Sequence, residues 1–593
     1  MVNSKLKKSP DYKSEYCCTI VKIGEVNPIE GKDRIGYTLV NGEKIVVRKD
    51  QVKEGDVLIY ASNETQLNEK FLSANNLFEV SSYELNSNSE EVEPFVMSNR
   101  SLKKELEAIQ KENNKLIRST NFIMTYEAEY LAAEKDDVKM ALAERFEKYC
   151  KYLNKATECE LLPESTEKTT EDLIIAAQRL INTNDIKINS LKSQIDNNSD
   201  FIRSHVGFFN KTGRVRAIRL GGVRSMGYLF TIDELAKYNP NVKDINLSEL
   251  IGEDFDTVED ELFVKAYVPF IPEKKQKSKV EKANKKIERF DRMINGEFSF
   301  HYDTQMFARN VDKFKPTDSV TISNKLHGTS GIFAKVHVKM PIKLPFHKWL
   351  WNKFVDLTGL FKSHRIIDYV VEYGNVTSSR KVIKNQYINK NVNKGYYSVD
   401  VWSEYGDLIY PYLEEGMTVY GEICGYETGQ NKMIQKKYDY GCKIGENFLM
   451  PYRITTSDEE GVKKEWEVMD VYDWTVRLIE SHPELKDKIH PITIFYHGTL
   501  GDLYPNLSQT EHWHTNVLEE MRYDTKHFGM EMNEPMCINK VPREGIVIRK
   551  DNDDTTEAFK LKCYKFLDAE AKQISDIEQG NGEVDVEMTE AYE

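Results

Sequence analysis

The sequence predicts a multidomain α+β protein. It comprises a small N-terminal β-barrel or sandwich, a helical, coiled-coil-like insertion, and a larger α+β domain. Three observations support this class. The 593 residues are too many for one compact core. Short apolar–polar alternations near the N-terminus are typical of strands, and heptads further along are typical of long paired helices. Strands and helices then mix without the regular order of a doubly wound sheet.

The first β region spans residues 17–62. Three runs in it alternate apolar and polar side chains, at residues 18–23, 44–48 and 56–60. Turn signals with Asn-Gly and Glu-Gly separate the runs, so we expect short strands of a barrel or sandwich.

A helical pattern replaces the alternation at residues 98–199. Isoleucines recur every seven residues, and a second position repeats three residues after each of the first three: Ile174, Ile181, Ile188 and Ile195 with Ala177, Asn184 and Leu191. This spacing predicts a coiled-coil seam, such as that of an antiparallel helical hairpin. The seam could pack within one chain or mediate self-association.

Strand-like runs return at residues 214–222 and 261–271, so the helices interrupt or directly follow the first β domain. The predicted organisation is as follows: a β domain at 1–97 and 200–272, a helical insertion at 98–199, a basic linker at 273–298, an α+β domain at 299–566, and an acidic disordered tail at 567–593.

The net charge of −14 does not exclude a nucleic-acid partner. Residues 567–593 hold nine acids and one lysine, a net −8, which leaves −6 for the rest. No apolar run approaches the ~20 residues of a membrane helix, and the polar N-terminus does not look like a signal peptide. Eight cysteines without a C-x-x-C pair predict neither a disulfide framework nor a zinc site. We therefore expect a cytoplasmic protein without a membrane partner.

The strongest chemical signal is Lys325, at the end of a short strand and just before Gly328. Free lysine has a pKa of about 10.4, so attack at neutral pH requires burial or nearby cations to lower the pKa. Alone, the Lys-x-His-Gly pattern is weak, and a chance occurrence on a surface turn would be the favoured interpretation.

Four further segments carry charged residues at strand ends or on strand faces. Arg380 follows Thr377-Ser378-Ser379, Glu422 lies in a strand that ends at Gly425, and Glu544 begins another strand. Lys560 and Lys562 share one face of a strand by alternation. Each of these could be an ordinary surface charge; their combination and order are the informative observation.

As an ordered set, Lys325, Arg380, Glu422, Glu544, Lys560 and Lys562 resemble motifs of the covalent nucleotidyltransferases, the ATP-dependent nucleic-acid ligases and mRNA capping enzymes. A further motif is matched by the stretch from Tyr438 to Ile454. The resemblance implies that Tyr452, or its rival Phe448, stacks on the purine. It covers most of residues 300–566.

The resemblance implies a mechanism. Lys325 attacks the ATP α-phosphate and becomes a lysyl–AMP, Lys560 and Lys562 neutralise that phosphate, and Glu544 helps to hold Mg²⁺ or Mn²⁺. Glu422 contacts the ribose, and Arg380 binds near the reactive ends. AMP then passes to a 5′-phosphate, and a 3′-hydroxyl displaces it.

The N-terminal half resembles the OB domain of RNA ligases in which this domain precedes the catalytic one. The similar segments include residues 19–35, 55–60 and 218–227, and residues 301–304 are similar to the stretch just upstream of that group's lysine. An ATP-dependent RNA ligase for RNA repair is therefore the leading hypothesis. The RNA could be a nicked duplex or an RNA–DNA hybrid, with phosphate contacts from Arg214, Arg216, Arg219 and Arg224. A DNA ligase, a capping enzyme, or a non-catalytic nucleic-acid-binding adaptor are the alternatives.

Three features depart from that family. The insertion at 98–199 is one, and a stretch of interleaved aromatic and basic residues at 341–364 is another. The second could stack on a nucleic-acid strand or form a packed helix. His327 stands where many relatives have Asp.

Overall fold

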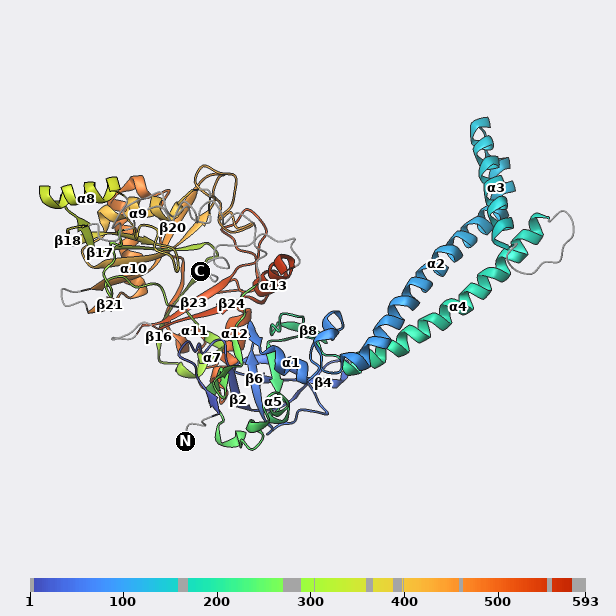
Figure 1. Ribbon diagram of the computed structural model, residues 1–593, viewed down its shortest axis with the longest axis horizontal. Coiled ribbons are helices and arrows are strands. Elements are labelled where there is room, and N and C mark those ends of the chain that lie inside the picture. The colour runs from blue at the N-terminus through green and yellow to red at the C-terminus, as the bar shows by residue number, and fades with distance from the viewer. Residues whose placement is uncertain are drawn as a thin grey trace. The chain divides into compact units, whose positions relative to one another are not determined.

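The computed structural model divides the chain into two compact units (Figure 1). The first unit comprises Met1–Ile23, Gly55–Ala217 and Gly227–Ala266, and the second comprises Gly24–Glu54, Ile218–Met226 and Tyr267–Glu593. The structure describes residues 5–157, 169–269, 290–302, 304–358, 366–387, 397, 399–457, 462–551 and 557–578. Most of the predicted basic linker and the end of the predicted acidic tail lie outside these ranges.

The β part of the first unit has a four-stranded antiparallel sheet in the order β10-β6-β2-β11. Its apolar positions alternate as expected, with Ile20, Ile59 and Phe255 buried in one core. The strands are β1 (Leu6–Lys7), β2 (Cys18–Lys22), β6 (Val57–Ser62), β7 (Thr65–Leu67), β10 (Gly227–Phe230), β11 (Asp254–Phe255), β12 (Thr257–Val258), β13 (Glu261–Leu262) and β14 (Val264–Ala266). Helices α1 (Glu69–Ala74) and α5 (Ile232–Tyr238) flank them.

The insertion is helical, as the heptads predict. It consists of α2 (Ser89–Ala132), α3 (Asp136–Thr157) and α4 (Thr170–His205). Ile109 of α2 packs against Ile188 and Leu191 of α4, so the seam is buried within one chain. Asn184 in the seam is partly buried, and its buried amide nitrogen makes no hydrogen bond to the described residues. Supercoiling and self-association stay predictions.

Two small antiparallel sheets that come early in the sequence belong to the second unit, and we call them the early hairpins. The first carries β3 (Asn27–Ile29), β4 (Lys32–Val40) and β5 (Glu43–Arg48); the second is β8 (Ile218–Leu220) with β9 (Val223–Ser225). Asn41 and Gly42 between β4 and β5 both have positive φ, as the tight turn requires. A Cβ at Gly42 would lie 2.4 Å from Leu518 Cδ2, so the turn packs closely against the rest of the unit.

Two five-stranded sheets form the body of the second unit. One has the order β15-β24-β23-β16-β22 and the other β18-β17-β19-β20-β21. The strands are β15 (Gln305–Met306), β16 (Ser319–Lys325), β17 (Thr329–Pro341), β18 (Tyr369–Ser378), β19 (Met417–Gly425), β20 (Asn447–Ser457), β21 (Lys463–Glu465), β22 (Ile494–Thr499), β23 (Gly545–Lys550) and β24 (Glu557–Lys562).

The helices of this unit are α7 (Phe307–Asn310), α8 (Phe346–Thr358), α9 (Val401–Ile409), α10 (Val468–Ser481), α11 (Leu500–Leu503), α12 (Trp513–Tyr523) and α13 (Tyr564–Glu578). Glu531 fixes the start of α13, because its carboxylate accepts the backbone N–H groups of Tyr564 and Lys565. The helix extends into the segment predicted as a disordered tail, and its Ile574 and Ile577 are buried. The predicted tail is therefore helical as far as Glu578. Its two isoleucines are three residues apart, so they lie on the same buried face of the helix.

The mixed α+β, multidomain class is confirmed by these elements. The strands predicted for one OB-like barrel are divided between the two units, and the pairings described here form separate sheets without closing a barrel. The OB-like barrel therefore stays a prediction. No described helix has the length and apolar character needed to cross a membrane.

Candidate active site

Three neighbouring strands bring Lys325 and Lys562 to the same level of one sheet. In β16, β23 and β24, Lys325 pairs with Gly545, and Gly545 pairs with Lys562. Gly545 has φ +152°, and a Cβ there would lie 2.1 Å from the Leu561 carbonyl oxygen. Only glycine therefore allows β23 and β24 to approach each other at this point. Glu544, the preceding residue, lies beside both lysines.

The carboxylate of Glu544 is the centre of this arrangement. Its Oε1 lies 2.8 Å from Lys325 Nζ and 3.6 Å from Lys562 Nζ, and its Oε2 lies 3.9 Å from His327 Nδ1. The side chain is only 4% exposed. We call Lys325, His327, Glu422, Glu544 and Lys562 the Glu544 cluster.

The Glu544 cluster favours a charged carboxylate at its centre. Burial alone would raise the pKa of Glu544, but the charges of Lys325, Lys562 and His327 outweigh burial, so the pKa lies below its ordinary value. Oε2 is buried and accepts no hydrogen bond from the described residues. A buried, charged oxygen without a donor is costly, so this atom suits a bound cation or water.

Glu422, on β19, fixes the turn after Lys325. Its Oε1 accepts the backbone N–H of Gly328 at 2.9 Å. A Cβ at Gly328 would lie 2.4 Å from the Ile423 carbonyl oxygen, so the turn needs glycine to pass this strand. Two residues that the sequence pattern did not single out also hold the turn: Gln435 donates to the Gly328 carbonyl, and Tyr440 accepts the His327 N–H at 2.7 Å.

Tyr452 and Phe448 differ in their surroundings. Burial raises the pKa of Tyr452, the charge of Glu422 adds to the rise, and the charge of Arg380 opposes it. The Tyr452 hydroxyl is 3.3 Å from Ser330 Oγ. Phe448 is 2% exposed and stacks on His490 at 4.3 Å, so its ring is already used in the core.

The alternation in β24 separates its apolar and basic side chains. Phe559 and Leu561 are buried in the core, whereas Lys560 and Lys562 lie on the other face. Lys560 pairs with Val547 in the sheet, one step of alternation from the Glu544 cluster. Lys562 is shared between Glu544 and Glu570 of α13, whose Oε1 lies 3.0 Å from Lys562 Nζ.

His327 replaces the acid common in the resembling family, and it is packed by rings. It meets Tyr438 at 4.9 Å and Phe566 at 5.0 Å, both edge to face. Phe566 and Glu570 both belong to α13, so this helix bounds the cluster. The sequence pattern gave no signal for Glu570, because its segment was predicted to be disordered.

The four arginines predicted to contact phosphates are all ion-paired within their own unit. Arg214 pairs with Glu64, and Arg216 lies 3.8 Å from Glu79. Arg219 and Arg224 both bind Asp568 of α13. The sequence could not reveal these acids, because they are distant along the chain.

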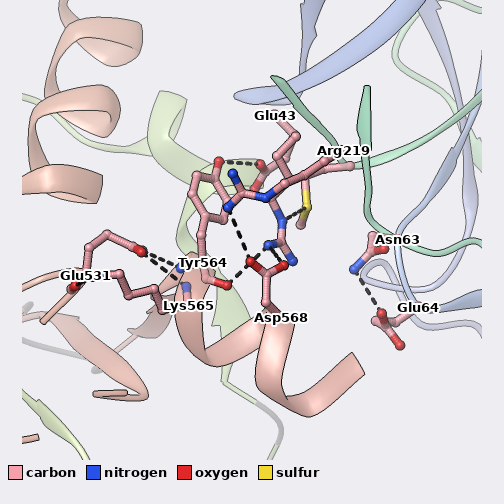
Figure 2. Close-up of polar contacts among 10 residues, drawn as sticks. Glu43, Asn63, Glu64, Arg219, Glu531, Tyr564, Lys565 and Asp568 are labelled. Atoms are coloured by element: carbon pink, nitrogen blue, oxygen red, sulfur yellow. Dashed lines mark hydrogen bonds and ion pairs between the residues drawn. The ribbon is translucent and has the colours of Figure 1, made fainter. Parts of the chain in front are cut away.

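Arg219 and Arg224 belong to a second group of charges that joins the early hairpins to α12 and α13. Figure 2 shows the contacts of Arg219 with Asp568 and of Glu43 with Tyr564. Arg522 Nη2 lies 2.5 Å from Glu43 Oε1, and the Tyr564 hydroxyl donates to Glu43 Oε2 at 3.3 Å. We call Glu43, Arg219, Arg224, Arg522, Tyr564 and Asp568 the hairpin clasp.

The residues present fit a divalent cation with few protein ligands. Among the described residues no three His, Cys, Asp or Glu side chains gather as a metal site. Mg²⁺ commonly takes one or two carboxylates and keeps its other positions for water and phosphate oxygens. Oε2 of Glu544 meets that requirement, since it is buried, charged and lacks a donor.

No family model and no curated protein matches the sequence. Similar solved structures include three forms of Naegleria gruberi RNA ligase. A mutant with AMP and Mn is 12% identical, with 94% of this chain and 99% of that chain covered and a TM-score of 0.43. A mutant with ATP and Mn is 12% identical, with 93% of this chain and 98% of that chain covered and a TM-score of 0.41. The ligase with PPi is 11% identical, with 94% of this chain and 99% of that chain covered and a TM-score of 0.41.

Proposed function

We propose that this protein is an ATP-dependent RNA ligase that joins 3′-hydroxyl and 5′-phosphate ends through a lysyl–AMP intermediate. The observation that carries the proposal is the Glu544 cluster: Lys325 ends a strand beside a buried carboxylate and a second lysine. The ordered motif set found in the sequence supplies the reaction class. An RNA repair role follows from the 3′-hydroxyl and 5′-phosphate chemistry of the resembling ligases.

In the first step, Lys325 Nζ attacks the α-phosphorus of ATP. A nitrogen–phosphorus bond forms and the bond between the α-phosphorus and the pyrophosphate oxygen breaks. In passing from ammonium to phosphoramidate, Nζ gives up two of its three protons to solvent and keeps one. Nucleotidyl transfer depends mainly on positioning and charge neutralisation. Lys562 lies beside the nucleophile, and Lys560 lies on the same face of β24, so both can meet the α-phosphate.

Glu544 holds the nucleophile before reaction. Its 2.8 Å ion pair orients the Lys325 side chain, so the pair must separate before Nζ can attack. Bound Mg²⁺ or Mn²⁺ would neutralise phosphate charge near the same carboxylate, and Oε2 of Glu544 is the atom that would hold it.

The nucleoside is assigned to residues of β19 and β20. Glu422 would contact the ribose while it holds the Gly328 turn, and Tyr452 would stack on the adenine. Arg380, whose charge acts on Tyr452, would bind near the reactive RNA ends. AMP then passes to the 5′-phosphate, and the 3′-hydroxyl of the other RNA end displaces it.

Incubation with ATP labelled at the α-phosphate tests the proposal. Wild-type protein with Mg²⁺ or Mn²⁺ should retain the label covalently, and Lys325→Ala should not. Label on the Ala variant would contradict the assignment of the nucleophile. Label from GTP instead of ATP would indicate a capping enzyme. No label with either metal, in folded protein, would favour a nucleic-acid-binding adaptor.

A second experiment separates RNA from DNA. Purified lysyl–AMP protein is given matched nicked duplexes, one of RNA, one of DNA and one RNA–DNA hybrid, without further ATP. Sealing of a strand with an RNA 3′-hydroxyl, and not of the DNA duplex, is expected. Preferential sealing of DNA would replace the proposal with a DNA ligase.

A further inference from the structure

Helix α8 exposes a stripe of apolar side chains along its whole length. Phe346 is 74% exposed, Leu350 52%, Phe354 49% and Leu357 88%. These positions are three or four residues apart, so they share one side of the helix. A helix on a protein surface normally turns such a stripe toward the core. In α8 the stripe faces solvent.

The opposite side of α8 is fixed to the second unit. Asn352 exchanges two hydrogen bonds with the backbone of Ile366, at 2.8 and 2.9 Å. Lys348 Nζ lies 2.6 Å from Asp368, and Val355 is buried. Since Lys348, Asn352 and Val355 are also three or four residues apart, this side anchors the helix and determines that the apolar stripe points outward.

Exposed apolar side chains also lie at the ends of β17 and β18, the strands before and after α8 in the chain. We define the α8 patch as the exposed apolar side chains of α8, of these strand ends and of the residues between them: Met340, Ile342, Phe346, Trp349, Leu350, Trp351, Phe354, Leu357, Tyr369, Val370 and Val371. Exposed apolar side chains in this number indicate an interaction site.

Basic residues predominate in the segment that carries the α8 patch. Residues 341–358 hold three lysines and one aspartate, and of the lysines Lys343 and Lys353 are exposed. The chain as a whole carries a net charge of −14, so this local excess of basic residues runs against the overall composition. A partner that presents negative charge next to an apolar layer is complementary to this arrangement.

Two observations favour a lipid surface over single-stranded RNA. Bases need the open face of an aromatic ring. The Trp349 ring is stacked with Phe346 at 5.8 Å and covered by Lys353 Nζ at 4.3 Å. In addition, the most exposed side chain, Leu357, is aliphatic and offers no ring for stacking.

The composition also favours lipid over a protein partner. Lysine is depleted in protein–protein interfaces. Helices that lie in the membrane interface combine Trp, Phe and Leu on one face with flanking Lys, whose long stems reach the headgroups.

We propose that the α8 patch binds the surface of an anionic lipid bilayer, with α8 lying in the plane of the headgroups. The aliphatic and aromatic stripe enters the acyl boundary, and Lys343 and Lys353 meet the lipid phosphates. This is peripheral binding, and it is independent of the proposed ligase activity. The sequence-based expectation of no membrane partner rested on the lack of long apolar runs, which concerns spanning helices alone.

Sedimentation of the full-length protein with vesicles tests this. One set of vesicles contains phosphatidylcholine with phosphatidylserine, and the other contains phosphatidylcholine alone. The test variant is Leu350→Asp/Leu357→Asp, and the matched control is Leu131→Asp/Met140→Asp, which changes two equally exposed apolar residues of α2 and α3. Both variants change exposed side chains, and circular dichroism verifies that they fold.

Wild type and the control should bind the anionic vesicles, and the test variant should bind roughly 100-fold more weakly, because two leucines no longer enter the bilayer. Brominated lipids should quench the fluorescence of Trp349 and Trp351 in wild type. Failure of wild type to bind, or equal binding by the test variant, overturns the proposal. RNA binding that is lost in the test variant, without vesicle binding, assigns the patch to RNA instead.

Discussion

The Glu544 cluster and the hairpin clasp are both groups of partly buried charges in the second unit, but they differ in how fully the charges are matched. In the clasp, Arg522 meets Glu43, and Asp568 is shared by Arg219 and Arg224. Tyr564 adds a hydrogen bond and lies under the guanidinium groups of Arg224 and Arg522. These contacts hold the early hairpins to the body of the unit.

In the Glu544 cluster, one carboxylate lies between two lysines, and one of its oxygens accepts no hydrogen bond from the described residues. Breaking a buried ion pair costs about 3–5 kcal/mol, so matched charges serve stability. Charges left incompletely matched are retained where a ligand completes them. We therefore expect variants of the hairpin clasp to lose stability and variants of the Glu544 cluster to lose activity.

The largest effect is expected for Glu544→Gln. The substitution keeps the shape of the side chain and removes the charge that orients Lys325 and holds the cation, so adenylation should slow by about 100-fold or more. The label-retention assay under single-turnover conditions measures this. The matched control is Glu43→Gln, a partly buried acid of the clasp. Equal losses of adenylation in both variants would contradict the assignment of the Glu544 cluster to activity and of the hairpin clasp to stability.

Arg522→Ala should destabilise the protein by about 3–5 kcal/mol, because it leaves Glu43 without its buried partner. Adenylation at a temperature where the variant is folded should match wild type. Urea denaturation measures the free energy of unfolding. The Arg522→Met/Glu43→Gln double variant should be less destabilised than the sum of the two single changes. A loss of adenylation in folded Arg522→Ala would show that the clasp also serves the chemistry.

Gly545→Ala should lower both the stability and the rate of adenylation. Gly545 directly follows Glu544 and pairs with Lys325 and Lys562 in the sheet. The added Cβ would lie 2.1 Å from the Leu561 carbonyl oxygen, and the φ of +152° is unfavourable for alanine. We expect a loss of about 1–3 kcal/mol of stability together with slower adenylation. Gly429→Ala is the control, because it also has positive φ but no atom within 4 Å of its Cβ. Unchanged adenylation in Gly545→Ala would show that strand spacing here does not set the position of Glu544.

Glu570→Gln should have a smaller effect, on substrate binding. Removing this acid releases Lys562 from a partly exposed ion pair, so the KM for ATP should fall about 2- to 5-fold. Steady-state pyrophosphate release measures it, and Asp576→Asn on the same helix is the control. A higher KM would indicate that Glu570 holds Lys562 in its productive position.

The smallest effect is on the pH dependence of stability. The pKa of Glu544 is lower in the folded protein than its ordinary value of 4.5, so its charge stabilises the fold above that pH. This contribution disappears as the pH falls through the folded pKa. The difference in unfolding free energy between wild type and Glu544→Gln should therefore shrink between pH values of about 7 and about 3. A difference that grows toward acid would show that burial dominates over the lysines.

Local patterns allowed much of the candidate site to be predicted. Lys325 is recognisable because a β-branched run ends at a glycine turn, and the shared face of Lys560 and Lys562 follows from the period of a strand. The partners of Arg219 and Arg224 could not be predicted, because Asp568 lies more than 300 residues away. Helix α13 was missed because its acidic composition is typical of disorder, while its buried isoleucines depend on the core that they meet.

By itself the sequence determined the class of the protein, the helical insertion and the identity of the candidate nucleophile, because each depends on periodicity or spacing over a few residues. The tertiary structure alone decided which carboxylate meets which cation, and which side of α8 faces solvent. Those outcomes depend on contacts between distant segments, such as Glu43 with Arg522 across 479 positions. Burial then decides whether a charge is matched within the fold, like Asp568, or left for a ligand, like Glu544.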